Sequence, residues 1–134
     1  MPINALEHFT LRCKDLEETR AFYAEVLGME VGPRPPFPFP GYWIYSGGTP
    51  VVHLAEEIEG VTAQDRPANQ EAGTGGLDHV AFRATELSAM LARLRKHDVP
   101  FREAEVPGAN LHQVFVYDPN KVMLELNFHN QPAK

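Results

Sequence analysis

The sequence predicts an α+β fold built from two βαβββ modules. A seven-residue phrase occurs twice, as L-E-H-F-T-L-R in residues 6–12 and as L-D-H-V-A-F-R in residues 77–83. Each copy alternates apolar and polar residues, which is typical of a half-buried strand. Each copy is also followed by a segment with the apolar spacing of an amphipathic helix. Internal repetition of this kind indicates a duplicated structural unit.

In the first module, a helix is predicted to begin after Asp15, where Glu18 completes a capping box, and to end at Gly28. Three short strands should follow, over 29–32, 42–46 and 51–55. The pair Gly47-Gly48 is suited to a tight turn between the last two strands. The segment 33–41 contains too many prolines for a central strand and is predicted to be irregular.

The second module repeats this order. Its helical stripe consists of Leu87, Met90, Leu91 and Leu94. Its last three strands are expected over 101–106, 111–117 and 122–128. The segment Asp118-Pro119-Asn120-Lys121 should form the final hairpin turn. We therefore predict a single domain over 1–134, with module 1 at 4–56, a linker or lid at 57–75 and module 2 at 76–130.

The composition excludes several classes of protein. The 134 residues carry a net charge of −6, which argues against general nucleic-acid binding. No apolar run reaches the length of a membrane span, and no signal peptide is visible. The only cysteine, Cys13, falls in a predicted strand, where a buried, unreactive thiol is expected. A cytoplasmic protein without a membrane or nucleic-acid partner is the expectation.

Strand alternation predicts which side chains face away from the helices. An ionisable group takes such a position in the first and last strand of each module, and these four groups are His8, His53, His79 and Glu125. A carboxylate among strand apolars is costly unless it is paired or bound to a cation. Three imidazoles and a carboxylate suit one divalent Ni, Co, Zn, Mn or Fe(II) ion, whereas calcium prefers oxygen alone.

The sequence resembles the vicinal oxygen chelate superfamily, the group of glyoxalase I, bleomycin-resistance proteins and extradiol dioxygenases. The resemblance rests on H-F-T-L-R-C-K-D-L-E-E-T-R-A-F-Y-A-E-V-L-G-M-E, V-V-H-L, G-L-D-H-V-A-F and Y-D-P-N-K-V-M-L-E-L. It implies paired modules forming a curved mixed sheet around a metal cavity. It also implies the metal ligands His8, His53, His79 and Glu125, and a homodimer with two metals.

The most similar enzymatic pattern is that of bacterial glyoxalase I. It implies a lyase or isomerase acting on a small substrate with vicinal oxygens through a metal-stabilised enolate, with Glu125 and His53 as candidate catalytic residues. Arg12 stands where glyoxalase I keeps a glutathione-contacting arginine. Two departures are His53, where glyoxalase I usually has glutamate, and Glu57, whose charge would repel glutathione. The candidate substrate-binding residues are Arg12, Trp43, His112 and Phe115.

Two other functions remain open from the sequence. In an extradiol Fe(II) dioxygenase, the ligands would be His8, His79 and Glu125, with His112 as a possible acid–base group. Against this hypothesis, Phe115 occupies the position where such enzymes usually carry tyrosine. In an antibiotic-sequestering protein, an acidic, aromatic groove would be formed by Phe37, Phe39, Tyr42, Trp43, Glu56, Glu57 and Glu59. Those aromatic residues are also compatible with a hydrophobic cluster under the proline-rich loop.

Overall fold

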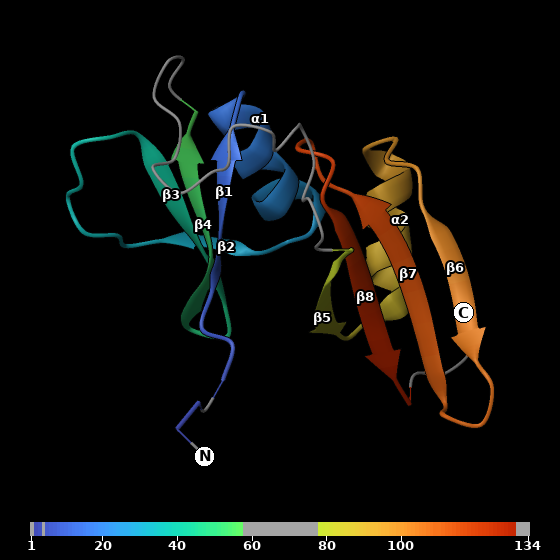
Figure 1. The fold of residues 1–134 in the computed structure, drawn as a ribbon. Helices are drawn as coiled ribbons and strands as arrows, with labels where there is room; N and C mark the ends of the chain where they lie inside the picture. The colour runs from blue at the N-terminus through green and yellow to red at the C-terminus, as the bar shows by residue number, and fades with distance from the viewer. Residues whose placement is uncertain (1, 4, 58–77, 131–134) are drawn as a thin grey trace. The chain divides into compact units, whose positions relative to one another are not determined.

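The computed structural model describes residues 2, 3, 5–57 and 78–130. The chain divides into two compact units, residues 1–66 and 67–134, and each is described by itself. Apart from Glu57, the predicted linker or lid at 57–75 lies outside the described residues. The predicted order of strand, helix and three strands is confirmed in both units (Figure 1).

The first unit is a four-stranded mixed sheet with the strand order β1-β4-β3-β2. Its elements are β1 (Phe9–Cys13), α1 (Leu16–Ala21), η1 (Phe22–Val26), β2 (Glu30–Gly32), β3 (Gly41–Ser46) and β4 (Thr49–Glu56). Strands β1 and β4, the first and last of the module, pair in parallel. The turn between β3 and β4 is formed by Gly47 and Gly48, with φ of 56° and 84°. Glycine suits these left-handed positions because it lacks a Cβ atom.

The helix of this unit differs from the prediction in its second half. As expected, it begins at Asp15, whose side chain accepts a hydrogen bond of 2.9 Å from the Glu18 backbone N–H. From Phe22 it continues as a π-helix, in which the Leu27 N–H donates to the Phe22 carbonyl over 3.0 Å. Gly28 then ends it with φ of 78°. Apolar spacing does not separate the two helix types, because Phe22 and Leu27 are buried in this wider turn as well.

Alternation along β4 sorts its side chains into two environments. Val52 and Leu54 are buried and lie on the face against which α1 packs. His53 lies between them in sequence and remains only partly buried. Cys13 of β1 is fully buried, as predicted. The two faces of the sheet therefore have separate roles, with one forming the core and the other presenting His53.

The second unit repeats this arrangement with the strand order β5-β8-β7-β6. Its elements are β5 (Val80–Ala84), α2 (Leu87–Lys96), β6 (Arg102–Val106), β7 (Leu111–Tyr117) and β8 (Met123–His129). Strands β5 and β8 pair in parallel, as β1 and β4 do. Helix α2 lies across one face of this sheet (Figure 1). The core residues Leu91, Leu94, Leu124 and Phe128 are almost completely buried. No helix among the described residues is long and apolar enough to cross a membrane.

The turn before β8 depends on one buried carboxylate. Asp118 is 4% exposed, and its Oδ1 atom accepts hydrogen bonds from the backbone N–H groups of Asn120, at 2.8 Å, and Val122, at 2.9 Å. Lys121 adopts a left-handed conformation with φ of 67°. Asp118 thus holds the reversal of the chain that sets the register of β8 against β7.

Replacing Asp118 with alanine should lower the free energy of unfolding by about 2–3 kcal/mol, because two backbone N–H groups lose a charged acceptor. Urea denaturation of the variant and the wild-type chain measures this difference. Asp118→Asn is the matched control, since its amide oxygen still accepts a hydrogen bond and the loss should be smaller. Equal destabilisation by alanine and asparagine would show that the two hydrogen bonds contribute little.

Candidate functional site

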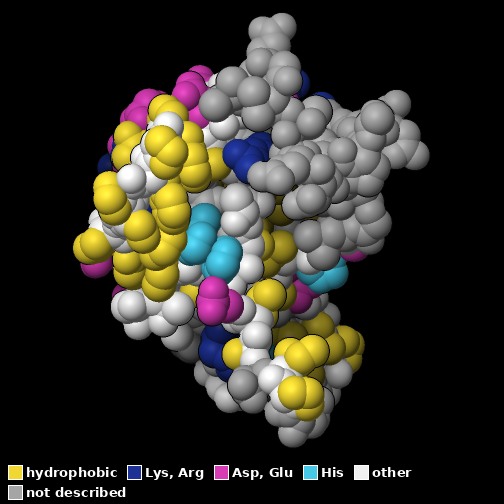
Figure 2. Space-filling view, turned by 60° about the vertical axis from the view of Figure 1, so that its left-hand side comes forward, with side chains coloured by type: hydrophobic (Ala, Val, Ile, Leu, Met, Phe, Trp, Pro, Cys, Tyr) yellow, Lys and Arg dark blue, Asp and Glu magenta, His cyan; other side chains and the backbone are white. Residues whose placement is uncertain are grey.

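The first unit brings His8 and His53 together. His8 directly precedes β1, and the parallel register pairs Thr10 of β1 with His53 of β4. The two imidazole rings are stacked, with centroids 3.7 Å apart and an interplanar angle of 15°. Figure 2 shows histidine side chains at the edge of a hydrophobic surface patch. Residues that are 45 positions apart in sequence therefore become neighbours through the pairing of β1 with β4.

His53 is held from two further directions. The Trp43 ring of the adjacent strand β3 stacks on it, with centroids 4.1 Å apart and an interplanar angle of 9°. Its Nε2 atom lies 3.1 Å from the Pro50 carbonyl oxygen, which can only accept a hydrogen bond. Burial lowers the pKa of the His53 imidazole, and the neighbouring His8 lowers it further. When His53 is neutral and its proton is on Nε2, the Nδ1 atom carries a lone pair that can bind a cation.

The second unit brings His79 and Glu125 together in the same way. His79 directly precedes β5, and Ala81 of β5 pairs with Glu125 of β8. The His79 Nε2 atom lies 3.3 Å from the Glu125 Oε1 atom, and only 14% of the Glu125 side chain is exposed. The pKa of His79 is raised, first by its hydrogen bond with Asp78 and also by the Glu125 charge. Each ring nitrogen of His79 therefore faces a carboxylate oxygen, Nδ1 that of Asp78 and Nε2 that of Glu125.

Glu125 is part of a chain of hydrogen bonds that sequence reasoning did not find. The Asn127 amide donates to Glu125 Oε2 over 2.8 Å, and the Gln113 amide donates to Asn127 Oδ1 over 3.2 Å. This chain leaves Oε1 facing His79. The alternation of M-L-E-L-N-F places Asn127 on the same side of β8 as Glu125, which is the signal that could have identified it.

The four predicted substrate-binding residues occupy different surroundings. Trp43 stacks on His53, as described above, and Arg12 is exposed on β1. Phe115 of β7 pairs with Glu125 and so lies on the same face of the second sheet. His112 is on the opposite face, because it alternates in phase with the buried residues Val114 and Val116. The structure therefore brings Trp43 and Phe115 close to ionisable pairs and does not bring His112 close to Glu125.

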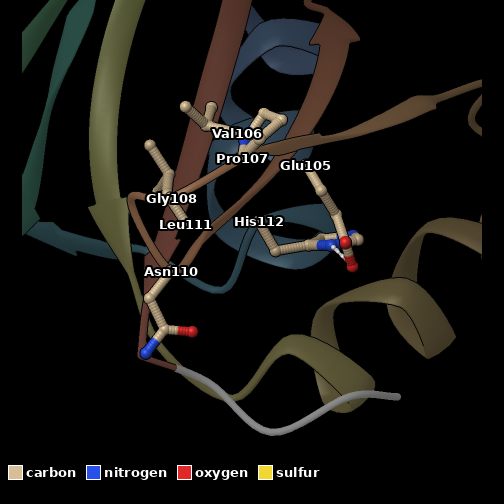
Figure 3. A pocket seen from close by; sticks show the side chains of 7 residues that line it. All are labelled: Glu105, Val106, Pro107, Gly108, Asn110, Leu111 and His112. Atoms are coloured by element: carbon tan, nitrogen blue, oxygen red, sulfur yellow. Dashed lines mark hydrogen bonds and ion pairs between the residues drawn. The ribbon is translucent and has the colours of Figure 1, made fainter.

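His112 instead lies between two carboxylates of β6. Its Nδ1 atom is 3.4 Å from Glu105, and its Nε2 atom is 3.9 Å from Glu103. A hollow of about 500 Å³ is lined by this part of the hairpin, by Glu105, Val106, Pro107, Gly108, Asn110, Leu111 and His112 (Figure 3). The hollow is formed by the end of the β6–β7 hairpin and includes neither His79 nor Glu125.

The aromatic residues of the first unit are divided between its two faces. Phe37 stacks on Phe39 and lies 6.4 Å from Trp43, and the Arg34 guanidinium lies 5.3 Å from each phenylalanine ring. Tyr42, by contrast, donates a hydrogen bond to Glu17 of α1 on the other side of the sheet. Among the described residues of the hypothetical drug-binding groove, Tyr42 and Trp43 thus lie on opposite faces, while Glu59 lies outside the described residues.

Imidazole nitrogens and carboxylate oxygens are donor atoms that divalent transition metals accept, and each unit holds two such side chains close together. Among the described residues, no group of three or more His, Cys, Asp or Glu side chains lies close enough to hold a metal ion. Each unit contributes a pair. The 3.3 Å between His79 Nε2 and Glu125 Oε1 fits two neighbouring ligands of one ion, which stand roughly 3.0–3.5 Å apart when each bond is about 2.0–2.2 Å.

Comparison with known proteins extends the similarity over most of the chain. The model of the Glyoxalase/Bleomycin resistance protein/Dioxygenase superfamily matches residues 5–126. Glyoxylase I 4 of Arabidopsis thaliana is 24% identical over 131 residues, which cover 92% of this chain and 70% of that protein.

Solved structures agree with this match at the level of the fold. Lactoylglutathione lyase from Agrobacterium tumefaciens superposes with a TM-score of 0.68 at 22% identity, covering 97% of each chain. The fosfomycin resistance protein FosX from Listeria monocytogenes superposes with a TM-score of 0.66 at 22% identity, covering 97% of this chain and 93% of that chain. With its two βαβββ units and a family match from residue 5 to residue 126, this chain belongs to the glyoxalase/bleomycin resistance protein/dioxygenase superfamily.

Proposed function

We propose that this protein is a divalent-metal-dependent lyase or isomerase of the glyoxalase type, which acts on a small substrate with vicinal oxygens. The metal ligands are His8, His53, His79 and Glu125. The observation that carries the proposal is the pairing within each unit, where a histidine before the first strand meets an ionisable residue of the last strand. Two such pairs, from one chain or from two chains of a homodimer, make one site.

Bound to these ligands, Ni, Co, Zn, Mn or Fe(II) would supply Lewis acidity for the substrate oxygens. Glu125 would have to leave the metal before its carboxylate could act as the general base, which is the role proposed for it. Its carboxylate takes the proton from the carbon of a hemithioacetal that bears the hydroxyl group and returns it to the neighbouring carbonyl carbon. The hydroxyl proton passes to the former carbonyl oxygen, so that a 2-hydroxyacyl thioester forms without net gain or loss of atoms. Asn127 keeps Oε2 occupied, which leaves Oε1 as the basic atom.

Glutathione is not required by this proposal. Arg12 is exposed on β1, and Glu57, which is also exposed, brings a negative charge next to the end of β4. The side chain that stacks on His53 from β3 is the aromatic ring of Trp43, which carries no charge to attract an anionic thiol. We therefore propose that the hemithioacetal of a 2-oxoaldehyde with a small neutral thiol is turned over at least as well as the glutathione adduct.

Metal binding should quench the fluorescence of Trp43. This residue is the only tryptophan of the chain, and its ring lies 4.1 Å from that of His53, so Ni²⁺ or Co²⁺ bound there would be within quenching distance. Titration of untagged protein with Ni²⁺ should give saturable quenching at one ion per chain. The loaded protein should then isomerise a 2-oxoaldehyde hemithioacetal without oxygen.

The matched control for this titration is His97→Ala, which removes an exposed imidazole at the end of α2 and should leave the quenching unchanged. His53→Ala should abolish it. A bound stoichiometry far below one, even after reconstitution, would contradict the proposal and favour a sequestering protein. Oxygen uptake with catechols, in place of anaerobic isomerisation, would favour the dioxygenase, although His112 lies on the opposite face from Glu125 and is not placed to be its acid–base group.

A further inference from the structure

Both copies of the repeated phrase place a carboxylate directly before the histidine, as L-E-H and L-D-H. In each unit this carboxylate contacts the histidine ring at the same atom. Glu7 Oε1 lies 2.9 Å from His8 Nδ1, and Asp78 Oδ2 lies 2.7 Å from His79 Nδ1. The repetition of one contact in two duplicated modules indicates a shared role for Glu7 and Asp78.

These contacts determine which nitrogen of each imidazole is available. An ionised carboxylate has only acceptor atoms, so Nδ1 must carry the proton and donate it. In the neutral ring the lone pair then resides on Nε2. For His79 this is the atom that faces Glu125 Oε1 at 3.3 Å. For His53 the assignment is reversed. The Pro50 carbonyl accepts a hydrogen bond from Nε2, so Nε2 carries the proton and Nδ1 the lone pair.

Stability alone gives little reason for the two carboxylates. The side chains of Glu7 and Asp78 are 86% and 85% exposed, and exposed ion pairs contribute little to folding. A carboxylate that holds the distal N–H of a metal-binding histidine, by contrast, orients the ring and raises its basicity as a ligand.

We propose that Glu7 and Asp78 are positioning residues, which hold His8 and His79 in the Nδ1–H tautomer so that Nε2 is presented to the metal. This inference rests on the proposed metal site. Glu7 and Asp78, the acidic residues of the repeated phrase, would thus support the metal site without being metal ligands.

The test uses the full chain and two readouts. In the metal-free protein with ¹⁵N-labelled histidine, two-bond ¹H–¹⁵N spectra report the tautomer of each ring. In Glu7→Ala the Nδ1–H fraction of His8 should fall, and in Asp78→Ala that of His79 should fall. Competition with a chromophoric chelator should show Ni²⁺ bound about 10–100-fold more weakly by each variant.

The conservative variants Glu7→Gln and Asp78→Asn should retain most of the tautomer preference, because their amide oxygens still accept a hydrogen bond, and should lose less affinity. Glu30→Ala, at an exposed position on β2, is the control and should change neither readout. Unchanged tautomers and unchanged Ni²⁺ affinity in both alanine variants would overturn this inference alone. A wild-type chain that binds no metal would overturn the proposed function, and this inference with it.

Discussion

Replacing Glu125 with glutamine should reduce turnover of the hemithioacetal by about 10²–10⁴-fold, because general base catalysis contributes about that factor. The amide keeps the size of the side chain and an oxygen that can face His79, but it cannot take up a proton. Metal content should fall only in part, since the three imidazoles remain. Initial rates of thioester formation and metal analysis of the same samples measure the two effects separately.

Glu105→Gln is the matched control for this substitution. Glu105 lies on β6 beside His112 and faces away from the Glu125 side of the sheet, so its neutralisation should leave turnover unchanged. If Glu125→Gln kept full activity, Glu125 would not be the base. If the variant lost activity and metal to the same extent, Glu125 would be a ligand without the proposed proton transfer.

Removing either of two histidines that belong to different units should weaken metal binding by a similar, large factor. A four-ligand zinc site is worth about 10–16 kcal/mol in total, so the loss of one ligand should cost about a hundredfold or more in affinity. His8→Ala in the first unit and His79→Ala in the second should therefore behave alike, although neither histidine belongs to the other's sheet. Chelator competition with Ni²⁺ measures both, and His97→Ala again serves as the unaffected control.

Mixing the His8→Ala and His79→Ala variants distinguishes a site completed within one chain from a site shared by two chains. If each site joins the first unit of one chain to the second unit of its partner, a mixed dimer of His8→Ala and His79→Ala chains has one site with all four ligands and one that lacks two. Refolding the variants together should then restore activity. Sites confined to one chain would give no restoration.

In the affinity measurement, unequal losses of Ni²⁺ affinity in His8→Ala and His79→Ala would show that one histidine lies outside the metal site.

The fold could be predicted from the sequence largely because both modules show the same order of strand alternation and helical apolar spacing. Alternation around His53 and Glu125 indicated strands with one buried face, and Val52 and Leu124 are indeed buried there. The pair Gly47-Gly48 and the Asp118 turn indicated two reversals of the chain. Glycine tolerates the positive φ of the first turn, and the Asp118 side chain accepts the backbone hydrogen bonds of the second. Strand ends differ from the prediction by one or two residues, as the three-residue strand β2 illustrates.

The surroundings of the site were harder to predict, because they depend on pairing between strands. The stacking of Trp43 on His53 follows from the register of β3 against β4, which a bulge at Ile44 and Tyr45 shifts. The π-helical turn that begins at Phe22 could not be predicted, because the spacing of apolar residues there also fits an α-helix. The facing of His112 was visible in principle, since Val114 and Val116 share its phase along β7.

Strands β1 and β4 pair in parallel, as do β5 and β8. This pairing determines when, during synthesis, His8 can meet His53 and His79 can meet Glu125. The β3–β4 hairpin closes through local contacts, whereas β1 must wait for a strand from the far end of its module. His8 and His53 therefore remain apart until almost the whole first module has emerged from the ribosome. A nascent chain that stops short of β4 carries His8 without His53, and so lacks the histidine pair of this unit.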